Sequence, residues 1–594
     1  MSLCETVLPE DVAYALLKVG SQTFSEIAID TEANGEDIRD GRGYALGISI
    51  AYREGSAGIS AFYLPFRHAN LGGGTNYNLG RFLPLLQQML DEKLVVYHNA
   101  KFDVVSLRTL GLDTGRTEQR FVDTMVLAHL LDENRPFTGK SLDSCARYYL
   151  KDEGGKRKSD NLRSAIKLVG WGMLTPALIS EYAMYDAVLT LRLWERLQPL
   201  LKAEGLGSVW PHKKRFLELL IQMEDYGVRV DTDLCTRMSA IGHREMADLQ
   251  SVLGANPASP KDLERLILDD LGLPEVISPK TGRRTFDKDA MKWYETLMEE
   301  LGSPLAQQIL TFRGWQKSCS SNYESYLSHL SPDGQLRPNY LMHGTITGRL
   351  SCREPNLQQI PKSGTKPWNG AMKACFVPRP GYALISIDYS QLELRLATVY
   401  AQEPELVRTF QDNRDIFSEM SASLGMSRND TKTFVYSTQY GAGLKRISNV
   451  FGITPTEANA IRQRYYETYP RFRAASDKAA RFVQDYGKLR LWSGRYRHFL
   501  YPDEEDRKAF NSLCQGGGAD IVERAMVRLS DDGFNDGEEC RILLQIHDEA
   551  VVEIREDKVK EYAPAIADSM ANVNFHPRLS SVKFAADAKP WGMK

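Results

Sequence analysis

The sequence predicts a multidomain α/β protein, and three observations lead to this fold class. Its 594 residues are too many for one hydrophobic core, so two to four domains are expected. Strand and helix patterns alternate from residue 1 to about 205, helical patterns dominate from about 206 to 340, and both mix again from 341 to 594. The 42% hydrophobic and 25% charged fractions are ordinary for a soluble globular protein.

Composition argues against several classes of protein. No apolar run reaches the roughly 18 residues that a membrane-spanning helix needs, and the start MSLCETVLPEDV lacks the pattern of a secretory signal. The eight cysteines are scattered without a C-x-x-C pair, which indicates neither a zinc site nor a disulfide framework. A reduced, cytoplasmic compartment therefore fits best. The net charge of -3 means that any surface for nucleic acid would be a local basic cleft.

The first third of the chain reads as a meander of strands followed by helices. FSEIAID, YALGISIAY and AFYLPF have strand patterns, KLVVYHNAKFDVVSLRTLG passes from strand to helix, and LISEYAMYDAVLTLRLWERLQPLL is a long helix. Phe216, Leu219, Leu220 and Met223 then have the spacing of an amphipathic helix.

A first group of acids lies in this α/β unit. Asp30 and Glu32 end an apolar strand, and their spacing of two puts both side chains on one face. Asp103 follows in HNAKFD, and Asp186 follows Tyr182 by one helical turn. Four such acids could hold two Mg²⁺ ions, which would polarise a phosphodiester and activate a water that the Tyr182 hydroxyl orients. Any one of these acids alone would read as a solvated surface charge.

A second group of acids lies in the last third. ALISIDYSQLELRLATVY reads as a buried strand that ends at Asp388 and leads into a helix. RILLQI-HDE-AVVEI reads as a hairpin with His547, Asp548 and Glu549 at its tip. Asp388 and Asp548 are 160 positions apart, so only the fold could unite them. Once united, they would form a two-metal site for phosphoryl transfer.

A helix with cations and aromatic rings lies between these two acids. Arg428, Lys432, Tyr436 and Tyr440 recur every four residues, which places them within an arc of about 120°. Cations suit a triphosphate, and aromatic rings suit stacking on a base or sugar. An ordinary amphipathic helix with basic edges is the alternative for this segment taken alone.

These motifs resemble those of two known families. The four acids and Tyr182 resemble the proofreading 3′–5′ exonucleases, over about 200 residues. DYSQLELR, R-x-x-x-K-x-x-x-Y-x-x-x-YG and HDE resemble the motifs of family A DNA polymerases, and HGTITGRLSCREPNLQQIP, SPKDLERLILDDLGLPE, SGRYRHFLYPD and DRKAFNSLCQGGGAD support the likeness. The resemblance implies a ribonuclease H-like exonuclease domain at 1–205, a thumb with connecting helices at 206–340, and a palm at 341–594 with fingers inserted at about 404–505.

The resemblance also implies roles for individual residues. Polymerase catalysis would use Asp388, Asp548 and Glu549, with Tyr389 as a further metal ligand, and the exonuclease metals would bind Asp30, Glu32, Asp103 and Asp186. The incoming nucleotide would contact Arg428, Lys432, Tyr436, Tyr440, Glu393 and Gln391, with Glu393 and Tyr440 against the sugar. The minor groove of the primer–template would contact Arg349, Asn356, Gln358, Arg507, Asn511, Gln515 and His547.

The family likeness implies cofactors and partners as well. Each site would take two Mg²⁺ ions, with Mn²⁺ able to replace them. Primer–template DNA, dNTPs, single-stranded DNA in the exonuclease site and replisome proteins would be partners of a monomer, with no membrane. Size and the segment around Tyr436 resemble polymerases of short-tailed phages, which implies genome replication in the cytoplasm of an infected bacterium. Because the exonuclease begins near residue 1, no 5′-nuclease domain is expected before it.

The sequence departs from the family motifs at two positions and leaves two alternative functions open. Many relatives have Asp-Ile-His where this chain has Asp415-Ile416-Phe417, so one expected phosphate contact is in doubt. Position 436 is Tyr where many bacterial repair relatives have Phe. A single-subunit RNA polymerase is one alternative, which Glu393 and the proofreading motifs disfavour. A non-catalytic nucleic-acid-binding protein is the other, which the complete acid sets disfavour.

Overall fold

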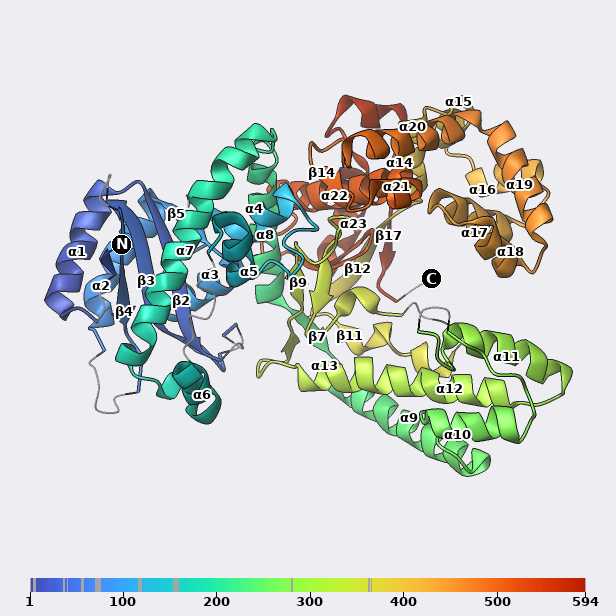
Figure 1. The fold of residues 1–594 in the computed structure, drawn as a ribbon, viewed down its shortest axis with the longest axis horizontal. Helices are drawn as coiled ribbons and strands as arrows, with labels where there is room; N and C mark the ends of the chain where they lie inside the picture. Colours follow the sequence, from blue (N-terminus) through green and yellow to red (C-terminus); the bar gives the residue numbers. More distant parts are fainter. Residues whose placement is uncertain are drawn as a thin grey trace.

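The computed structural model describes residues 2–3, 7–35, 38–39, 41–54, 58–69, 76–115, 120–152, 160–278, 281–361, 364 and 366–592. Three regions follow one another along the chain and lie side by side (Figure 1): a sheet with helices on both faces, a group of long helices, and a second sheet that carries two further groups of helices. None of the helices in these ranges is long and apolar enough to cross a membrane.

The N-terminal region is built on a six-stranded sheet of order β1-β4-β3-β2-β5-β6. Strand β3 is antiparallel to both β2 and β4, whereas β2, β5 and β6 are parallel to one another. This mixed order is that of a ribonuclease H-like fold. The strands are β1 (Ser2–Leu3), β2 (Glu26–Asn34), β3 (Tyr44–Glu54), β4 (Gly58–Pro65), β5 (Leu94–Tyr97) and β6 (Arg120–Asp123).

Alternation along β2 explains why both faces of this sheet are covered. Ile27 and Ile29 pack with α1, α2 and α3 in one core, whereas Ala28 packs with α4 and α7 in another. Asp30 and Glu32 are two and four residues after Ala28, so their side chains lie on the same face of the sheet as Ala28, the face that α7 covers. The helices are α1 (Glu10–Thr23), α2 (Leu79–Glu92), α3 (Ala100–Thr109), α4 (Thr124–Leu131), α5 (Leu142–Cys145), α6 (Asp160–Val169) and α7 (Pro176–Ala203).

The helical region is the part of the chain that we expect to form the thumb and its base. Helices α9 and α12 pack against each other, and a small separate core around Met291, Tyr294 and Ile309 holds the tip together. Helix α7 ends at Ala203 and α8 begins at Trp210, so the boundary that we propose at residue 205 falls between helices. The helices are α8 (Trp210–Tyr226), α9 (Thr232–Leu253), α10 (Pro260–Glu264), α11 (Lys288–Glu300), α12 (Leu305–Ser318) and α13 (Glu324–Ser328).

The segment expected to form the palm contains a four-stranded antiparallel sheet of order β15-β16-β12-β17, called the palm sheet below. Helix α23 (Val559–Ala571) packs against β12, β16 and β17, and α22 (Ala509–Asp531) packs against both α23 and α14 (Leu392–Ala401). The strands are β12 (Tyr382–Tyr389), β15 (Cys540–Ile546), β16 (Glu549–Arg555) and β17 (Ala586–Pro590).

The segment expected to form the fingers consists of the helices between α14 and α22, drawn in orange in Figure 1. They are α15 (Pro404–Gln411), α16 (Ile416–Leu424), α17 (Arg428–Gln439), α18 (Leu444–Phe451), α19 (Pro455–Thr468), α20 (Pro470–Tyr486) and α21 (Pro502–Glu505).

Short strands join these regions. A boundary between residues 340 and 341 would fall inside β9 and separate part of it from its partner β10, so we propose that both strands belong with the palm. The strands are β7 (Val228–Val230), β8 (Gln335–Leu336), β9 (Asn339–Leu341), β10 (Ser351–Arg353), β11 (Phe376–Val377), β13 (Lys488–Arg490) and β14 (Tyr496–His498).

Candidate functional site

The exonuclease-type acids gather where β2 meets α7. Burial and the negative charges of Asp186, Glu32 and Asp30 raise the pKa of the Tyr182 hydroxyl well above its usual range, so that hydroxyl stays protonated and can donate a hydrogen bond. Glu32 is buried, and across the sheet it pairs with Gly47. The structure thus brings three of the four predicted acids together with the predicted tyrosine.

Asp103 reaches the same strand from α3. Its Oδ1 accepts hydrogen bonds from the backbone N of Thr31 at 2.9 Å and from Thr31 Oγ1 at 2.8 Å. Burial raises the pKa of the Asp103 carboxyl above its usual range, although the bonds from Thr31 favour the ionised form. Asp123, which the sequence reasoning missed, accepts from the backbone N of Ala100 at 2.8 Å and so fixes the first turn of α3.

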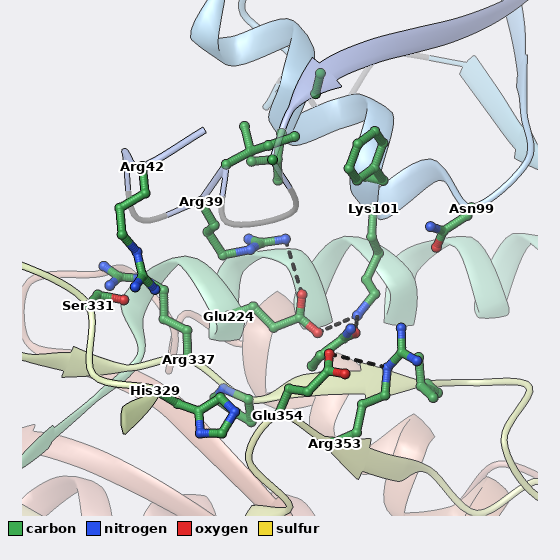
Figure 2. A pocket seen from close by; sticks show the side chains of 18 of the residues that line it. Arg39, Arg42, Asn99, Lys101, Glu224, His329, Ser331, Arg337, Arg353 and Glu354 are labelled. Carbon is green, nitrogen blue, oxygen red and sulfur yellow. Dashed lines mark hydrogen bonds and ion pairs between the residues drawn. The ribbon is translucent and has the colours of Figure 1, made fainter. Parts of the chain in front are cut away.

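A cavity of about 820 Å³ opens beside Glu32, between the exonuclease region and the base of the thumb. Figure 2 shows Arg39, Lys101 and Glu224 on its wall, with Glu224 paired to both cations. Five Arg and Lys residues face three Glu residues around the cavity, which favours an anionic occupant. These residues are Arg39, Arg42, Lys101, Arg337, Arg353, Glu32, Glu224 and Glu354.

The two polymerase-type acids meet at one end of the palm sheet. Asp388 on β12 is directly opposite Glu549 on β16, and the backbone N of Tyr389 donates to the carbonyl of Asp548 at 3.2 Å. His547 has a φ of +57°, which allows the two-residue turn between β15 and β16. Residues 160 positions apart in the sequence therefore lie side by side.

Hard oxygen donors dominate this end of the sheet. Burial raises the pKa of the Asp548 carboxyl. The positive charge of Arg349 lowers this pKa, and the negative charge of Glu393 raises it further. The Tyr389 hydroxyl donates to Met570 O at 2.5 Å on the core side, so only its main-chain carbonyl is left for a metal. Carboxylate and carbonyl oxygens suit Mg²⁺ or Mn²⁺. Glu549 is already engaged by the Ser386 hydroxyl and lies 3.5 Å from Lys373 Nζ.

A buried glutamate joins the palm to the fingers. Glu393 is 5% exposed, and its carboxylate accepts hydrogen bonds from Arg349 and, at 2.9 Å, from the Tyr440 hydroxyl. Arg349 Nη2 also lies 3.5 Å from Asp548 Oδ1. Gln391 precedes α14 with a φ of +56° and turns the chain from Asp388 toward Glu393. Glu393 and Tyr440 therefore form one wall beside the two acids.

Helix α17 presents the predicted row of cations and rings. Arg428, Lys432 and Tyr440 are exposed and Tyr436 is partly buried, whereas Phe434 and Val435 face the core. Arg428 binds Asp415 through two hydrogen bonds of 2.6 and 3.2 Å, and this contact lowers the pKa of Asp415 to about 2. The four-residue spacing places these side chains on one side of the helix, and Arg428 and Lys432 are exposed on it.

Phe417 lies under this row. It is 1% exposed, its ring is 5.9 Å from that of Tyr436, and the cations of Arg428 and Lys432 lie about 6.0 and 5.9 Å from its centre. A buried phenyl ring offers no hydrogen bond to a phosphate. Phe417 therefore supports the side chains of Arg428, Lys432 and Tyr436 by packing. It cannot form the hydrogen bond to a phosphate that a histidine at this position could form.

The predicted primer–template residues come from four places: the loop before β10, the short helix Leu357–Gln359, α22 with the turn before it, and the turn between β15 and β16. Arg507, Asn511 and Gln515 follow one face of α22 and the turn before it, while Asn356 caps the short helix Leu357–Gln359. Gln358 is only 7% exposed, and its amide donates to Gln545 at 2.6 Å. Gln545 in turn donates to the carbonyl of His547, so Gln358 supports the turn that carries His547 and Asp548 indirectly, through Gln545. No sequence pattern marked Gln545.

Asp132, Glu133 and His498 also come close enough to hold a metal ion. Arg497 Nη1 and His498 Nδ1, however, already bind Glu133 at 2.8 and 2.9 Å. We interpret this group as a contact between the exonuclease region and the hairpin β13–β14.

Comparison with known proteins now decides the family. Residues 230–589 match the model of DNA polymerase family A, and residues 5–202 match a 3′-5′ exonuclease family. The chain belongs to DNA polymerase family A. It carries the exonuclease domain ahead of the polymerase domain, as the motifs predicted.

Relatives of this family A polymerase include DNA polymerase I of Rhizobium leguminosarum, 29% identical over 95% of this chain and 58% of that protein. The thermostable DNA polymerase I of Thermus filiformis is 31% identical over 66% of this chain and 49% of its own length. The chain thus spans about half to three fifths of these relatives. A solved structure, described as the POL domain of Pol1 from M. smegmatis in complex with DNA primer-template and dNTP, has a TM-score of 0.81 over 98% of both chains at 23% identity, which shows a shared fold.

Proposed function

We propose that this polymerase extends a DNA primer along a template by nucleotidyl transfer from dNTPs, and that it removes nucleotides from the primer 3′ end at a second site. The observation that carries the proposal is the meeting of Asp388 and Asp548 at the end of the palm sheet, beside the wall of Glu393 and Tyr440. Membership of family A supplies the reaction class.

The chain's own groups have distinct roles in this proposal. Two bound Mg²⁺ or Mn²⁺ ions would activate the primer hydroxyl and neutralise the triphosphate at Asp388, Asp548 and the Tyr389 carbonyl. Arg428 and Lys432 bind the triphosphate. Because the pair of Arg428 with Asp415 is exposed, exchanging that partner for a phosphate costs little.

The wall of Glu393 and Tyr440 accounts for the choice of sugar. A hydrogen bond of 2.9 Å holds the Tyr440 hydroxyl against the Glu393 carboxylate. The 2′-hydroxyl of a ribonucleotide would therefore clash with these two side chains. Selection of dNTPs over ribonucleotides separates this proposal from an RNA polymerase.

The exonuclease proposal places single-stranded DNA in the cavity beside Glu32. Its basic wall attracts the phosphates of an unpaired primer end, and Tyr182 with its protonated hydroxyl orients the attacking water. The acids Asp30, Glu32, Asp103 and Asp186 would hold two divalent ions beside this cavity, and Glu32 is the one of the four that lines it.

The setting that we propose is replication of a phage genome in the cytoplasm of an infected bacterium. We propose that the enzyme works as a monomer, with replisome proteins as further partners. The motif segment around Tyr436 and the overall size support this setting by resemblance.

A pair of variants tests the two activities. Asp30→Ala with Glu32→Ala is expected to abolish 3′–5′ degradation of single strands and to leave primer extension within about twofold, because the two acid groups lie on different sheets. Asp388→Ala is expected to do the reverse, with at least about a thousandfold loss of extension. An Asp388→Ala enzyme that extends primers at the wild-type rate would refute the polymerase assignment.

A further inference from the structure

A buried arginine outside both acid groups joins three elements of the polymerase. Arg495, which directly precedes β14, is 3% exposed. Its Nη2 donates to the carbonyl of Thr347 at 2.8 Å and to that of Gly516 at 3.3 Å, and its Nε donates to Asp520 Oδ1 at 3.1 Å. One guanidinium thus ties the loop before Arg349 to helix α22.

The surroundings are shaped to this guanidinium. Gly348 has a φ of +84°, and a Cβ there would lie 2.5 Å from the guanidinium carbon of Arg495. A Cβ on Gly516 would lie 3.2 Å from Nη2. Both glycines therefore leave the space that the planar group fills.

The charge of Arg495 is matched inside the protein. Asp520 is 4% exposed, and Lys213 lies 3.9 Å from the same carboxylate. Burial opposes ionisation of Asp520, yet Arg495 and Lys213 hold its pKa below the usual value. The guanidinium is consequently anchored through Nε by an ion pair, and its Nη2 donates to both carbonyls.

These two carbonyls belong to segments that carry predicted primer–template residues. Thr347 is two residues before Arg349, which contacts Glu393 and Asp548. Gly516 follows Gln515 on α22. We propose that Arg495 is a positioning residue that sets Arg349 and Gln515 at a fixed separation, so that the enzyme extends a correctly paired primer end and rejects a mispaired one. This inference rests on the proposed polymerase function.

A lysine cannot replace this group. Its single ammonium lacks the planar fork that reaches two carbonyls and a carboxylate at once. Arg495→Lys therefore keeps the charge and the ion pair with Asp520 while loosening the bonds to Thr347 and Gly516.

Arg497 provides a matched control two residues away. It is also 3% exposed and also pairs with a buried acid, but that acid is Glu133 of the exonuclease domain, at 2.8 Å. Arg497→Lys thus perturbs an equally buried guanidinium on the same hairpin without touching Thr347 or Gly516.

The test measures kcat/KM for extension of matched and mispaired primer ends, in a background lacking the exonuclease through Asp30→Ala and Glu32→Ala. Arg495→Lys is expected to lower the ratio of matched to mispaired extension by about tenfold, the effect of losing one good hydrogen bond. Arg497→Lys is expected to leave that ratio within twofold. A merely structural role would lower both rates together and keep the ratio, which would overturn the inference.

A double variant tests the route of the effect. If Arg495 acts through Arg349, adding Arg495→Lys to Arg349→Ala is expected to change the ratio by less than about twofold, because the coupled residue is already gone. Independent, multiplying effects would refute that route. Should Arg495→Lys yield no folded protein, Gly348→Ala displaces the same guanidinium and is expected to lower the ratio in the same direction.

Failure of the proposed function gives a different result. A wild-type chain that extends no primer at all would refute the polymerase proposal itself. A wild-type enzyme that discriminates strongly, combined with an unchanged ratio in Arg495→Lys and Gly348→Ala, would refute only the role of Arg495.

Discussion

Tyr436 shows how much can depend on one oxygen atom. Its ring lies between those of Phe417 and Tyr440, with centroid distances of 5.9 and 6.1 Å, on the row of α17 that faces the polymerase acids. Burial and the charges of Glu393 and Asp548 raise the pKa of its hydroxyl, which is therefore a donor at neutral pH. A dideoxynucleotide lacks the 3′-hydroxyl that a normal nucleotide offers, and the Tyr436 hydroxyl can occupy the polar gap.

We therefore expect Tyr436→Phe to raise discrimination against dideoxynucleotides by at least about tenfold, since a hydrogen bond to a charged group contributes roughly 1.5–3 kcal/mol. The measurement is the ratio of kcat/KM for normal and dideoxy substrates in an exonuclease-deficient background. Tyr466→Phe on α19 of the fingers is a control that should leave the ratio unchanged. An unchanged ratio in Tyr436→Phe would mean that its hydroxyl does not face the sugar.

At the scale of elements, α22 depends on three glycines that helix propensity disfavours. Gly516, Gly517 and Gly518 are all buried in the middle of a helix of 23 residues. Alanine at such a position would gain about 1 kcal/mol of propensity. A Cβ on Gly517, however, would lie 2.7 Å from Leu396 of α14 and 3.0 Å from Trp492 of the β13–β14 turn. Close approach of three elements therefore outweighs propensity.

Gly517→Ala is expected to destabilise the polymerase domain by about 1–3 kcal/mol, because overpacking of a filled core exceeds the gain in helix propensity. The midpoint of urea unfolding measures the change. Gly207→Ala is the control, since a Cβ at that position meets no heavy atom within 4 Å and should alter stability by less than about 0.5 kcal/mol. A Gly517→Ala protein as stable as wild type would mean that α14 and α22 can move apart.

The sequence predicts features that local patterns determine, but not the side-chain contacts between elements that are distant in the sequence. Asp388, Asp548 and the α17 row can be predicted as candidates because local patterns carry them: a strand end, a hairpin turn and a four-residue repeat. The ties of Gln358 to Gln545 and of Arg428 to Asp415 follow from side-chain directions that no local pattern encodes. Asp103 illustrates the same limit, because its bond to Thr31 depends on how α3 docks on β2.

At the scale of the whole molecule, binding of DNA should be governed by phosphates. A polymerase accepts any sequence, so its affinity comes mainly from Lys and Arg contacts to the backbone. We expect the dissociation constant to rise steeply with salt, by roughly tenfold or more between 50 and 200 mM, and to vary little between duplexes of different sequence. Titration of labelled primer–templates of several sequences at several salt concentrations checks this, and salt-independent binding would contradict it.

The attachment of the exonuclease domain to the rest of the molecule leads to the last prediction. Glu224 on α8 is 3% exposed and binds Lys101 of α3, Arg39 at 3.1 Å and the backbone N of Tyr340 at 2.8 Å. Burial lowers the pKa of Lys101, and Glu224 is the charge that counteracts this. Arg39 keeps a second partner in Asp225, whereas Lys101 otherwise donates to the Asn339 side chain and the Tyr340 carbonyl, so Glu224 is its one acidic partner in the part of the chain that the structure describes.

Glu224→Gln should therefore leave a buried ammonium without its negative partner, at a cost of about 3–5 kcal/mol. Replacing both groups, as Glu224→Gln with Lys101→Met, should recover most of that loss, because no unpaired charge then remains buried. Glu195→Gln is the control, since its pair with Arg53 is exposed and should contribute less than about 1 kcal/mol. The midpoint of the first transition in urea unfolding gives the change in stability. The rate at which a protease cleaves the chain between the domains gives a second measure of how firmly they are attached. A Glu224→Gln protein that behaves like Glu195→Gln would mean that the domains are held together by apolar packing alone.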